Sequence, residues 1–190
     1  KENKIIVKTK SKTYPILIGS NLLYKISNIL KKNNLFFQKC LIVVDSKIPT
    51  KKISSLKKNI KCKKKIIYFF NSSEKNKSQK SVNKILDILF KNNFNREDCL
   101  ISLGGGITGD VTGFAASLFK RGLKFVNIPT TLLAQVDSSI GGKTGVNNQY
   151  GKNLIGSFMQ PDLVISDINM LNSLPKRELI CGYGEILKHS

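Results

Sequence analysis

Short apolar segments recur along this chain, and lysine-rich polar stretches separate them. Several of the segments are continuously apolar, which is typical of strands that are buried on both faces of a sheet. The pattern predicts strands at residues 5–8, 14–18, 40–45, 65–70, 99–103, 125–128 and 163–166. We expect the first two to form an antiparallel hairpin at the edge of the sheet.

Helical patterns lie between these strands. Residues 21–32 and 81–92 each place leucine, isoleucine or valine on one helical face, and residues 111–119 form a third helical run. Strand and helix alternate through most of the chain, which favours an α/β fold with a largely parallel sheet.

The alternation of strand and helix patterns ends before Leu174. The last segment, LPKRELICGYGEILKHS, predicts a helix that begins with Pro175. No earlier segment offers this helix an obvious packing partner. We therefore expect the chain to be cut short, with a second, mainly helical domain missing.

Length and composition indicate a folded domain and argue against a membrane or secreted protein. A length of 190 residues with 41% hydrophobic residues fits one ordinary folded domain. No run approaches the roughly 18 apolar residues of a membrane span, and the N-terminus lacks an apolar signal core. The four cysteines are scattered without CxxC spacing. These features predict a cytoplasmic protein with reduced thiols, no membrane partner and no cysteine-bound zinc.

The formal net charge of +20 suggests a nucleic-acid partner, but its distribution argues against one. Residues 1–100 carry 24 lysines and arginines against 6 acidic residues, whereas residues 101–190 carry 8 against 6. The excess is almost all lysine and accompanies abundant asparagine and isoleucine. We interpret it as codon bias on a solvated surface and predict no nucleic-acid partner. A basic nucleic-acid-binding module is the alternative from another class.

The first chemical signal is GGGITGD at residues 104–110, between an apolar strand and a helical run. A strand, a glycine turn and a helix together direct backbone N–H groups and the helix dipole at a phosphate. Tight-turn packing without a ligand is the alternative. The motif follows the fourth or fifth strand, whereas a standard Rossmann fingerprint follows the first. A dinucleotide bound here would therefore need a different variant.

The second signal is SSIGGKTGVN at residues 138–147. It lacks the GxxxxGK[ST] spacing of nucleotide triphosphatases, which argues against that class. Lys143, beside two glycines, is nevertheless suited to a phosphate or carboxylate. Lys152 and Asn153 add a cation and an amide. Asp137 is suited to a sugar-like hydroxyl or, alternatively, to capping its own loop.

The terminal helix holds a third set of polar residues. Glu185 and Lys188 are three residues apart and share a helix face, where a surface ion pair is the simplest interpretation. His189 is the only histidine, so a histidine-based metal site would need residues outside this sequence.

Taken in order, GGGITGD, KRG, IPTTLLAQVDSSIGGKTGVN, GKNLIGSF, QPDLVISD, LPKRE and GYGEILKH resemble the 3-dehydroquinate synthase family. The resemblance is dense from Cys99 to Ser190 and looser before it. It implies an N-terminal Rossmann-like, NAD-binding α/β domain and a C-terminal, mainly helical metal-binding domain. In this chain residues 1–173 would form the first domain, and residues 174–190 would form only the opening helix of the second.

The resemblance implies conversion of 3-deoxy-D-arabino-heptulosonate 7-phosphate to 3-dehydroquinate and phosphate, the second step of the shikimate pathway. NAD would transiently oxidise a ring hydroxyl, phosphate would leave by elimination, and the hydride would return before ring opening and aldol closure. A divalent metal, zinc or cobalt, would polarise the reacting oxygen. The expected activity is that of an NAD- and metal-dependent carbon–oxygen lyase acting on a phosphorylated sugar acid.

Carried over onto matching positions, the resemblance also implies sets of site residues. The set implied to bind NAD comprises Asp45, Ser72, Ser73, Glu74, Lys75, Asn76, Lys77, Gly105, Gly106, Ile107, Thr108, Gly109, Asp110, Thr130, Thr131, Lys143, Lys152, Met170, Leu171, Asn172 and Ser173. The set implied to bind substrate and act in catalysis comprises Arg121, Asp137, Lys143, Lys152, Asn153 and Lys188. Arg121 would reach into the neighbouring subunit of a homodimer. Glu185 would be the first metal ligand, and the family's other two ligands, both histidines, are absent here.

The chain departs from the family at residues 72–77, where SSEKNK replaces D/P-G-E-x-x-K. Glu74 and Lys77 match but the glycine does not, which puts the geometry of that turn in question. Ser173 stands where the family often has threonine.

Related classes are the alternatives. Inosose and valiolone synthases use similar loops, whereas metal-dependent alcohol and glycerol dehydrogenases share the architecture but lack the VDSSIGGKTGVN and GKN combination. A degraded pseudogene product is a further alternative. We also expect the 190-residue chain alone to be inactive, because it has one metal ligand of three, and to be poorly soluble, because its last helix exposes an apolar face.

Overall fold

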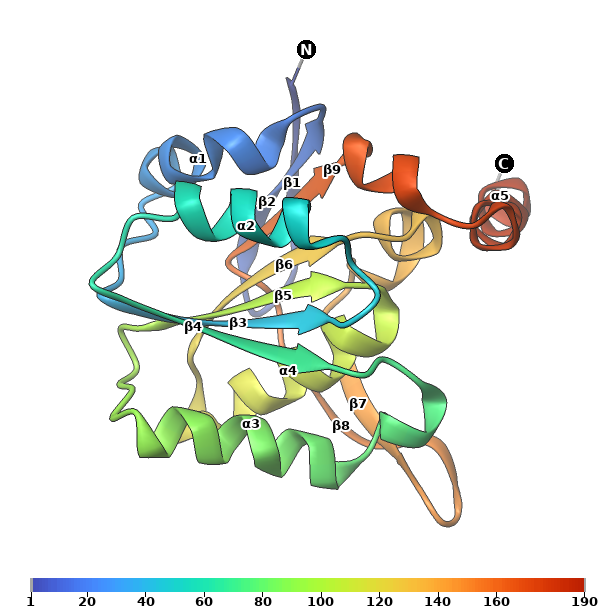
Figure 1. Cartoon of the computed structure of the whole chain (residues 1–190). Helices are drawn as coiled ribbons and strands as arrows, with labels where there is room; N and C mark the ends of the chain where they lie inside the picture. The colour runs from blue at the N-terminus through green and yellow to red at the C-terminus, as the bar shows by residue number, and fades with distance from the viewer. Residues whose placement is uncertain (1, 190) are drawn as a thin grey trace.

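The structure is a computed structural model, and it describes residues 2–189. Seven strands form one sheet in the order β1-β2-β9-β6-β5-β3-β4 (Figure 1). The strands are β1 (Glu2–Lys8), β2 (Thr13–Gly19), β3 (Lys39–Asp45), β4 (Lys64–Phe70), β5 (Cys99–Gly104), β6 (Lys124–Pro129) and β9 (Leu163–Asp167). All seven lie where the apolar segments predict them. The edge strand β1 pairs antiparallel with β2, and every other pair in this sheet is parallel, so the expected fold class is confirmed.

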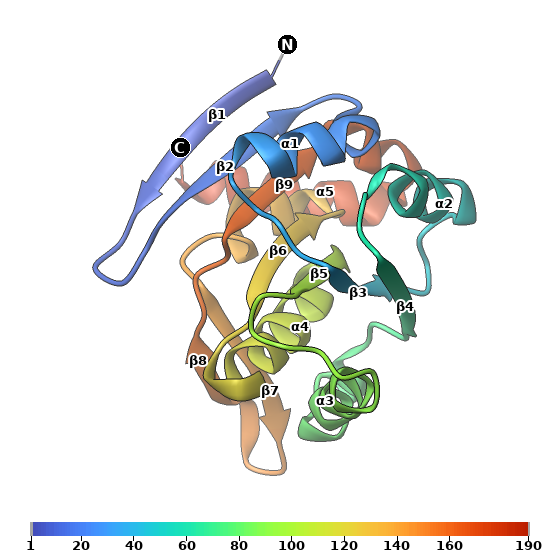
Figure 2. The same ribbon diagram turned by 90° about the vertical axis from the view of Figure 1, so that its left-hand side faces the viewer.

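Helices cover both faces of the sheet. The short helix η1 (Leu22–Lys25) with α1 (Ile26–Lys32) and α2 (Thr50–Asn59) lies on one face, and α3 (Gln79–Lys91) and α4 (Gly106–Leu118) lie on the other (Figures 1 and 2). The central strands are buried on both sides, which explains their continuous apolar runs. Helix α2 has no counterpart among the predicted helices. Its sequence TKKISSLKKN buries only Ile53 and Leu56, so its apolar pattern is weak.

A separate two-stranded hairpin packs beside α4. It consists of β7 (Lys143–Asn148) and β8 (Gly151–Phe158), which are antiparallel. The sequence did not predict it, because its strands are rich in glycine and polar residues. The hairpin approaches α4 closely at Gly113, where a Cβ atom would lie 2.6 Å from Cγ2 of Thr144. The segment interpreted as a loop around Lys143 is therefore the start of a strand.

The last helix, α5 (Lys176–His189), lies across one side of the molecule, near the carboxyl ends of the parallel strands (Figures 1 and 2). The expectation that nothing earlier packs against it is wrong. It contacts the π-helical turn η4 (Ala134–Ser138), and a Cβ at Gly182 would lie 2.5 Å from Cγ of Leu132. Its outer side nevertheless exposes Ile180, Tyr183 and Leu187, as the amphipathic pattern predicts. The proposed domain division after residue 173 stays a prediction.

The connections leave a crevice at the carboxyl ends of two central strands. The chain leaves β3 through α2 on one face to reach β4, and it leaves β5 through α4 on the other face to reach β6. In open α/β sheets such a switch point is where ligands bind. Among residues 2–189, no helix is long and apolar enough to cross a membrane. The expected cytoplasmic location and the expected lack of a nucleic-acid partner stay predictions.

Candidate active site

A pocket of about 510 Å³ opens at this switch point. Ten residues of the set implied to bind NAD line it, drawn from the ends of five strands and the segments that follow them: Asp45, Ser72, Glu74, Gly105, Gly106, Ile107, Thr130, Thr131, Met170 and Ser173. They are brought together from positions up to 128 residues apart in sequence. We call this cavity the glycine-turn pocket.

The floor of the glycine-turn pocket is the amino end of α4. Gly105 caps this 13-residue helix with an extended backbone, and Gly106 is its first residue. The Thr130 amide donates to the Gly104 carbonyl at 2.9 Å, which holds the ends of β5 and β6 together. No acidic side chain lies in the first helical turn. The free N–H groups of this turn are therefore suited to an anionic group such as a pyrophosphate.

Residues 72–77 form a wall beside this pocket, and Ser73 stands there in place of the family's glycine. The segment contains the short helix η2 (Glu74–Asn76), and the Ser73 hydroxyl accepts from the Asn76 amide at 3.3 Å. Ser73 has φ −151°, an extended conformation that any residue adopts. The turn therefore does not require glycine, and serine supplies a helix cap instead.

Lys77 links this wall to the helix and the hairpin. Its ammonium lies 2.5 Å from Oδ2 of Asp110 and donates to Oδ1 of Asn153 at 2.5 Å. The side chain of Lys77 is buried. Burial raises the pKa of Asp110 above its usual range, although the bond from Lys77 acts in the opposite direction. The ion pair thus compensates a carboxylate that is costly to bury alone.

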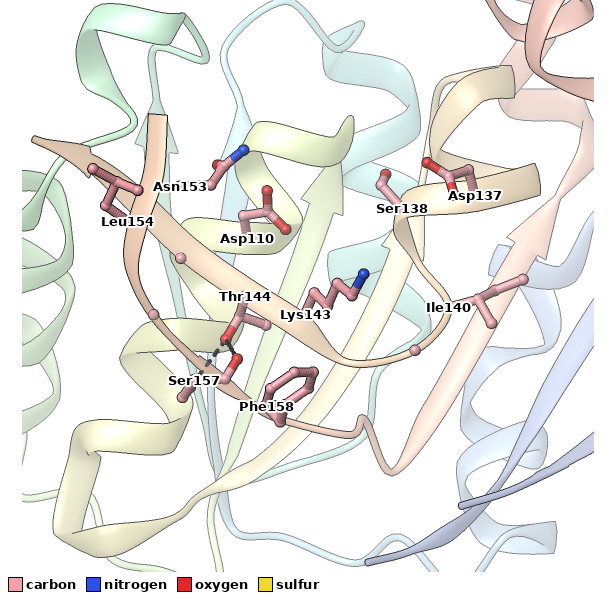
Figure 3. A pocket seen from close by; sticks show the side chains of 13 residues that line it. Asp110, Asp137, Ser138, Ile140, Lys143, Thr144, Asn153, Leu154, Ser157 and Phe158 are labelled. Atoms are coloured by element: carbon pink, nitrogen blue, oxygen red, sulfur yellow. Dashed lines mark hydrogen bonds between the residues drawn. The ribbon is translucent and has the colours of Figure 1, made fainter. Parts of the chain in front are cut away.

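A second pocket, of about 730 Å³, lies between α4, the η4 turn and the hairpin (Figure 3). We call it the hairpin pocket. Asp110, Asp137, Lys143 and Asn153 line it, so four candidate residues from four elements converge on one cavity. The resemblance assigned Asp110 to the cofactor, yet the structure places it in the lining of this pocket. Two carboxylates, an ammonium and an amide form a polar surface suited to hydroxyl and anionic groups of a ligand.

Lys152 takes another position. It lies in β8 with an exposed side chain, and its ammonium is 3.8 Å from Oε2 of Glu74. Glu74 also accepts from the Asn147 amide group at 2.8 Å. Lys152 lines neither pocket but stands at the junction between the segment 72–77 and the hairpin.

Helix α5 carries Glu185 and Lys188, which form the expected ion pair at 2.9 Å. The bond to Glu185, with a smaller contribution from Asp137, raises the pKa of Lys188. The negative charge of Asp137 therefore stabilises the charged form of Lys188. Within residues 2–189, no group of three histidine, cysteine, aspartate or glutamate side chains is arranged to hold a metal ion. The role of Glu185 as a metal ligand therefore stays a prediction.

The remaining candidates lie outside the two pockets. Arg121 ends η3 (Phe119–Arg121), at the amino end of β6 and away from both. Thr108 is fully buried under Gly104, and its hydroxyl has no hydrogen-bond partner. Other candidates adjoin the glycine-turn pocket in sequence without lining it: Ser73, Lys75, Asn76, Lys77, Gly109, Leu171 and Asn172.

Several residues that line the two pockets were not among the site residues predicted from the sequence. In the glycine-turn pocket these include Lys47, Ile48 and Pro49, which lead into α2. Pro49 before a run of alternating polar and apolar residues is a helix-start signal that could have identified them. In the hairpin pocket they include Thr144, Ser157 and Phe158. Those residues face the pocket only because β7 and β8 pair, so their role depends on the missed hairpin.

Comparisons with known proteins bear on the family and the fold. The family model for the N-terminal part of 3-dehydroquinate synthase matches residues 67–181. A 3-dehydroquinate synthase of Pelagibacter ubique (strain HTCC1062) is 65% identical over 187 residues, which are 98% of this chain and 51% of that protein. A solved 2-deoxy-scyllo-inosose synthase, complexed with carbaglucose-6-phosphate, NAD+ and Co2+, has a TM-score of 0.88 at 26% identity, covering 98% of this chain and 50% of its own. ValA, the 2-epi-5-epi-valiolone synthase of Streptomyces hygroscopicus subsp. jinggangensis 5008 with NAD+ and Zn2+ bound, has a TM-score of 0.81 at 27% identity, covering 97% and 51%.

The sheet order and the segments around it therefore define an α/β domain of the kind found in sugar phosphate cyclases. Within that class, the family match and the 65% identity are specific. The chain belongs to the 3-dehydroquinate synthase family, a family of enzymes. It spans about half the length of the curated relatives it matches.

Proposed function

We propose that this chain is the NAD-binding half of a 3-dehydroquinate synthase, which converts 3-deoxy-D-arabino-heptulosonate 7-phosphate to 3-dehydroquinate and phosphate. One observation carries the proposal. Residues 72–77 connect the two pockets: Glu74 lines the glycine-turn pocket, and Lys77 bonds Asp110 and Asn153, which line the hairpin pocket. An enzyme that oxidises and reduces its substrate needs cofactor and substrate pockets that adjoin in this way.

The residues of the glycine-turn pocket fit NAD. The amino end of α4 would hold the pyrophosphate, with Gly105 and Gly106 allowing close approach. Thr130 and Thr131 would bound the cofactor on the β6 side, and Asp45 would lie on the β3 side. NAD bound here would supply a reversible hydride acceptor. Two solved relatives hold NAD+, which supports the same cofactor for this chain.

The hairpin pocket would hold the phosphorylated sugar acid. Lys143 would bind an anionic group, while Asp137 and Asn153 would orient hydroxyls. Lys188 would contribute from α5. Arg121, which lies away from both pockets of its own chain, would act in the neighbouring subunit of a homodimer.

Zinc or cobalt is supported by the relatives solved with Co2+ and Zn2+. Residues 2–189 supply only Glu185 toward such a site and do not form a complete one. No chemical step is therefore assigned to a metal from these residues. The expected inactivity of the 190-residue chain alone follows from the same incompleteness.

The proposal is tested by measuring phosphate release from 3-deoxy-D-arabino-heptulosonate 7-phosphate with the full-length protein. Release that requires NAD and stops with a chelator is the expected result. A folded protein that binds NAD but releases no phosphate would contradict the proposed substrate. That outcome would favour an inosose or valiolone synthase, the class to which two structural relatives belong.

A further inference from the structure

Three of the four cysteines, distant in sequence, gather at the amino ends of β3 and β5. Cys40 and Cys99 are directly paired across these two strands. Cys62 lies in the segment between α2 and β4, and its Sγ is 3.6 Å from Sγ of Cys40. Cys99 contacts the Leu100 carbonyl instead. The sulfurs of Cys40 and Cys62 thus lie within hydrogen-bonding distance of each other.

The two thiols differ in access and in charge. Cys40 is fully buried, whereas Cys62 is partly exposed. The hydrogen bond with Cys40 and the nearby Lys65 ammonium lower the pKa of Cys62 to about 7. Lys65 is held beside it by donating to the Ile60 carbonyl at 2.8 Å. A partly exposed thiol of low pKa beside a buried partner resembles the arrangement of reactive cysteine pairs.

We propose that Cys40 and Cys62 form a reversible dithiol–disulfide site that reacts with small anionic disulfides such as glutathione disulfide. The sulfurs would have to approach by about 1.5 Å to reach bonding distance. Cys62 can supply this movement because it lies outside the helices and strands. Lys61 and Lys63 flank it in sequence and favour an anionic reagent.

The chemistry balances in two exchanges. The Cys62 thiolate attacks one sulfur of glutathione disulfide, forms a mixed disulfide and releases one glutathione thiolate. The Cys40 sulfur then attacks Sγ of Cys62, and its proton passes to the second leaving glutathione thiolate. The protein dithiol is oxidised by two electrons, and one glutathione disulfide is reduced to two glutathione molecules.

The test uses the full-length protein carrying Cys181→Ser, which removes the exposed cysteine on α5. The protein is incubated with glutathione disulfide, quenched in acid, alkylated and mapped by mass spectrometry without reduction. The expected product links the peptides of Cys40 and Cys62 and disappears after treatment with dithiothreitol. In Cys40→Ala, glutathione should remain attached to Cys62, whereas Cys99→Ala should still form the linked product.

Two results would overturn the proposal. One is stable glutathionylation of Cys62 in protein that retains Cys40. The other is linkage of Cys62 to Cys99. Both are read from proteins that retain Cys40, so they decide the question even if Cys40→Ala does not fold. As a second measurement, glutathione disulfide should react several-fold faster than the cationic disulfide cystamine at low salt, and equal rates would contradict the role of the lysines.

Discussion

Lys77 places one ammonium between two side chains of the hairpin pocket, 2.5 Å from Asp110 and 2.5 Å from Asn153. These contacts join three segments: the wall at residues 72–77, helix α4 and strand β8. A point charge with several donors suits this position because it satisfies a carboxylate and an amide at once.

Replacing Lys77 with methionine should lower the free energy of unfolding by about 3 kcal/mol, because it leaves the half-buried Asp110 without its cation. Urea denaturation of the full-length protein measures the change. The Lys77→Met/Asp110→Asn double variant should lose less than the sum of the two single changes. Additive losses would show that the pair is not coupled. Lys80→Met, at an exposed position, is the matched control.

Two glycines of α5 offer a paired test of its packing. A Cβ at Gly182 would lie 2.6 Å from Cβ of Leu132, whereas one at Gly184 meets open space. Gly184→Ala should stabilise the helix by up to about 1 kcal/mol through propensity alone. Gly182→Ala should displace α5 from η4. Hydrogen exchange of the α5 amides should slow in the first variant and quicken in the second, and slower exchange in both would disprove the contact.

Lys143 should matter for the substrate rather than for the fold. It is exposed in the hairpin pocket, and we find no ion pair for it among the described contacts. Lys143→Met should raise the substrate KM by about tenfold to a hundredfold, the value of one charge-assisted hydrogen bond. Phosphate release at varied substrate concentration provides the measurement. Lys91→Met, on the exposed end of α3, should leave KM unchanged.

The reactivity of Cys62 should depend on pH near neutrality. Its pKa of about 7 predicts that alkylation by iodoacetamide quickens as pH rises and is half-maximal at about pH 7. Cys40→Ala removes the hydrogen bond that lowers this pKa, so the midpoint should move upward. A midpoint that stays in place would mean that the bond does not act on the thiolate. Peptide mass spectrometry in the Cys181→Ser background follows the rate.

Oxidation of the same pair should stabilise the fold. A bond between Cys40 and Cys62 closes a loop that spans 22 positions, for which chain entropy gives about 3 kcal/mol. The melting temperature of the oxidised protein should therefore exceed that of the reduced protein. A lower melting temperature would indicate strain in the bonded state. Cys62→Ala should show no difference between oxidising and reducing buffer.

The apolar segments predicted the sheet because burial on both faces leaves a clear pattern in sequence. The same reasoning missed α2, because its many lysines leave only a narrow apolar face and therefore a weak apolar pattern. It also missed the hairpin, because β7 and β8 are held by packing on α4 rather than by their own apolar residues. The resemblance named ten of the residues that line the glycine-turn pocket but only four of those that line the hairpin pocket. Their grouping into separate cavities could not be predicted, since it depends on how β7 and β8 pair.

Single contacts were less predictable still. The burial of Lys77 depends on Asp110 and Asn153 arriving from α4 and β8. The approach of Cys62 to Cys40 depends on where the chain turns between α2 and β4. Sequence spacing reveals neither contact, because each depends on how elements that are far apart in the chain pack together.

The wall at residues 72–77 contacts both pockets, so we expect ligand binding in one to affect ligand binding in the other. A ligand in the glycine-turn pocket that shifts Glu74 would also shift Lys77, and with it Asp110 and Asn153. Linkage is reciprocal, so a sugar phosphate in the hairpin pocket would change the affinity for the dinucleotide by the same factor. The order in which the two ligands bind would then follow their concentrations in the cell, and neither pocket would need a gate to enforce it.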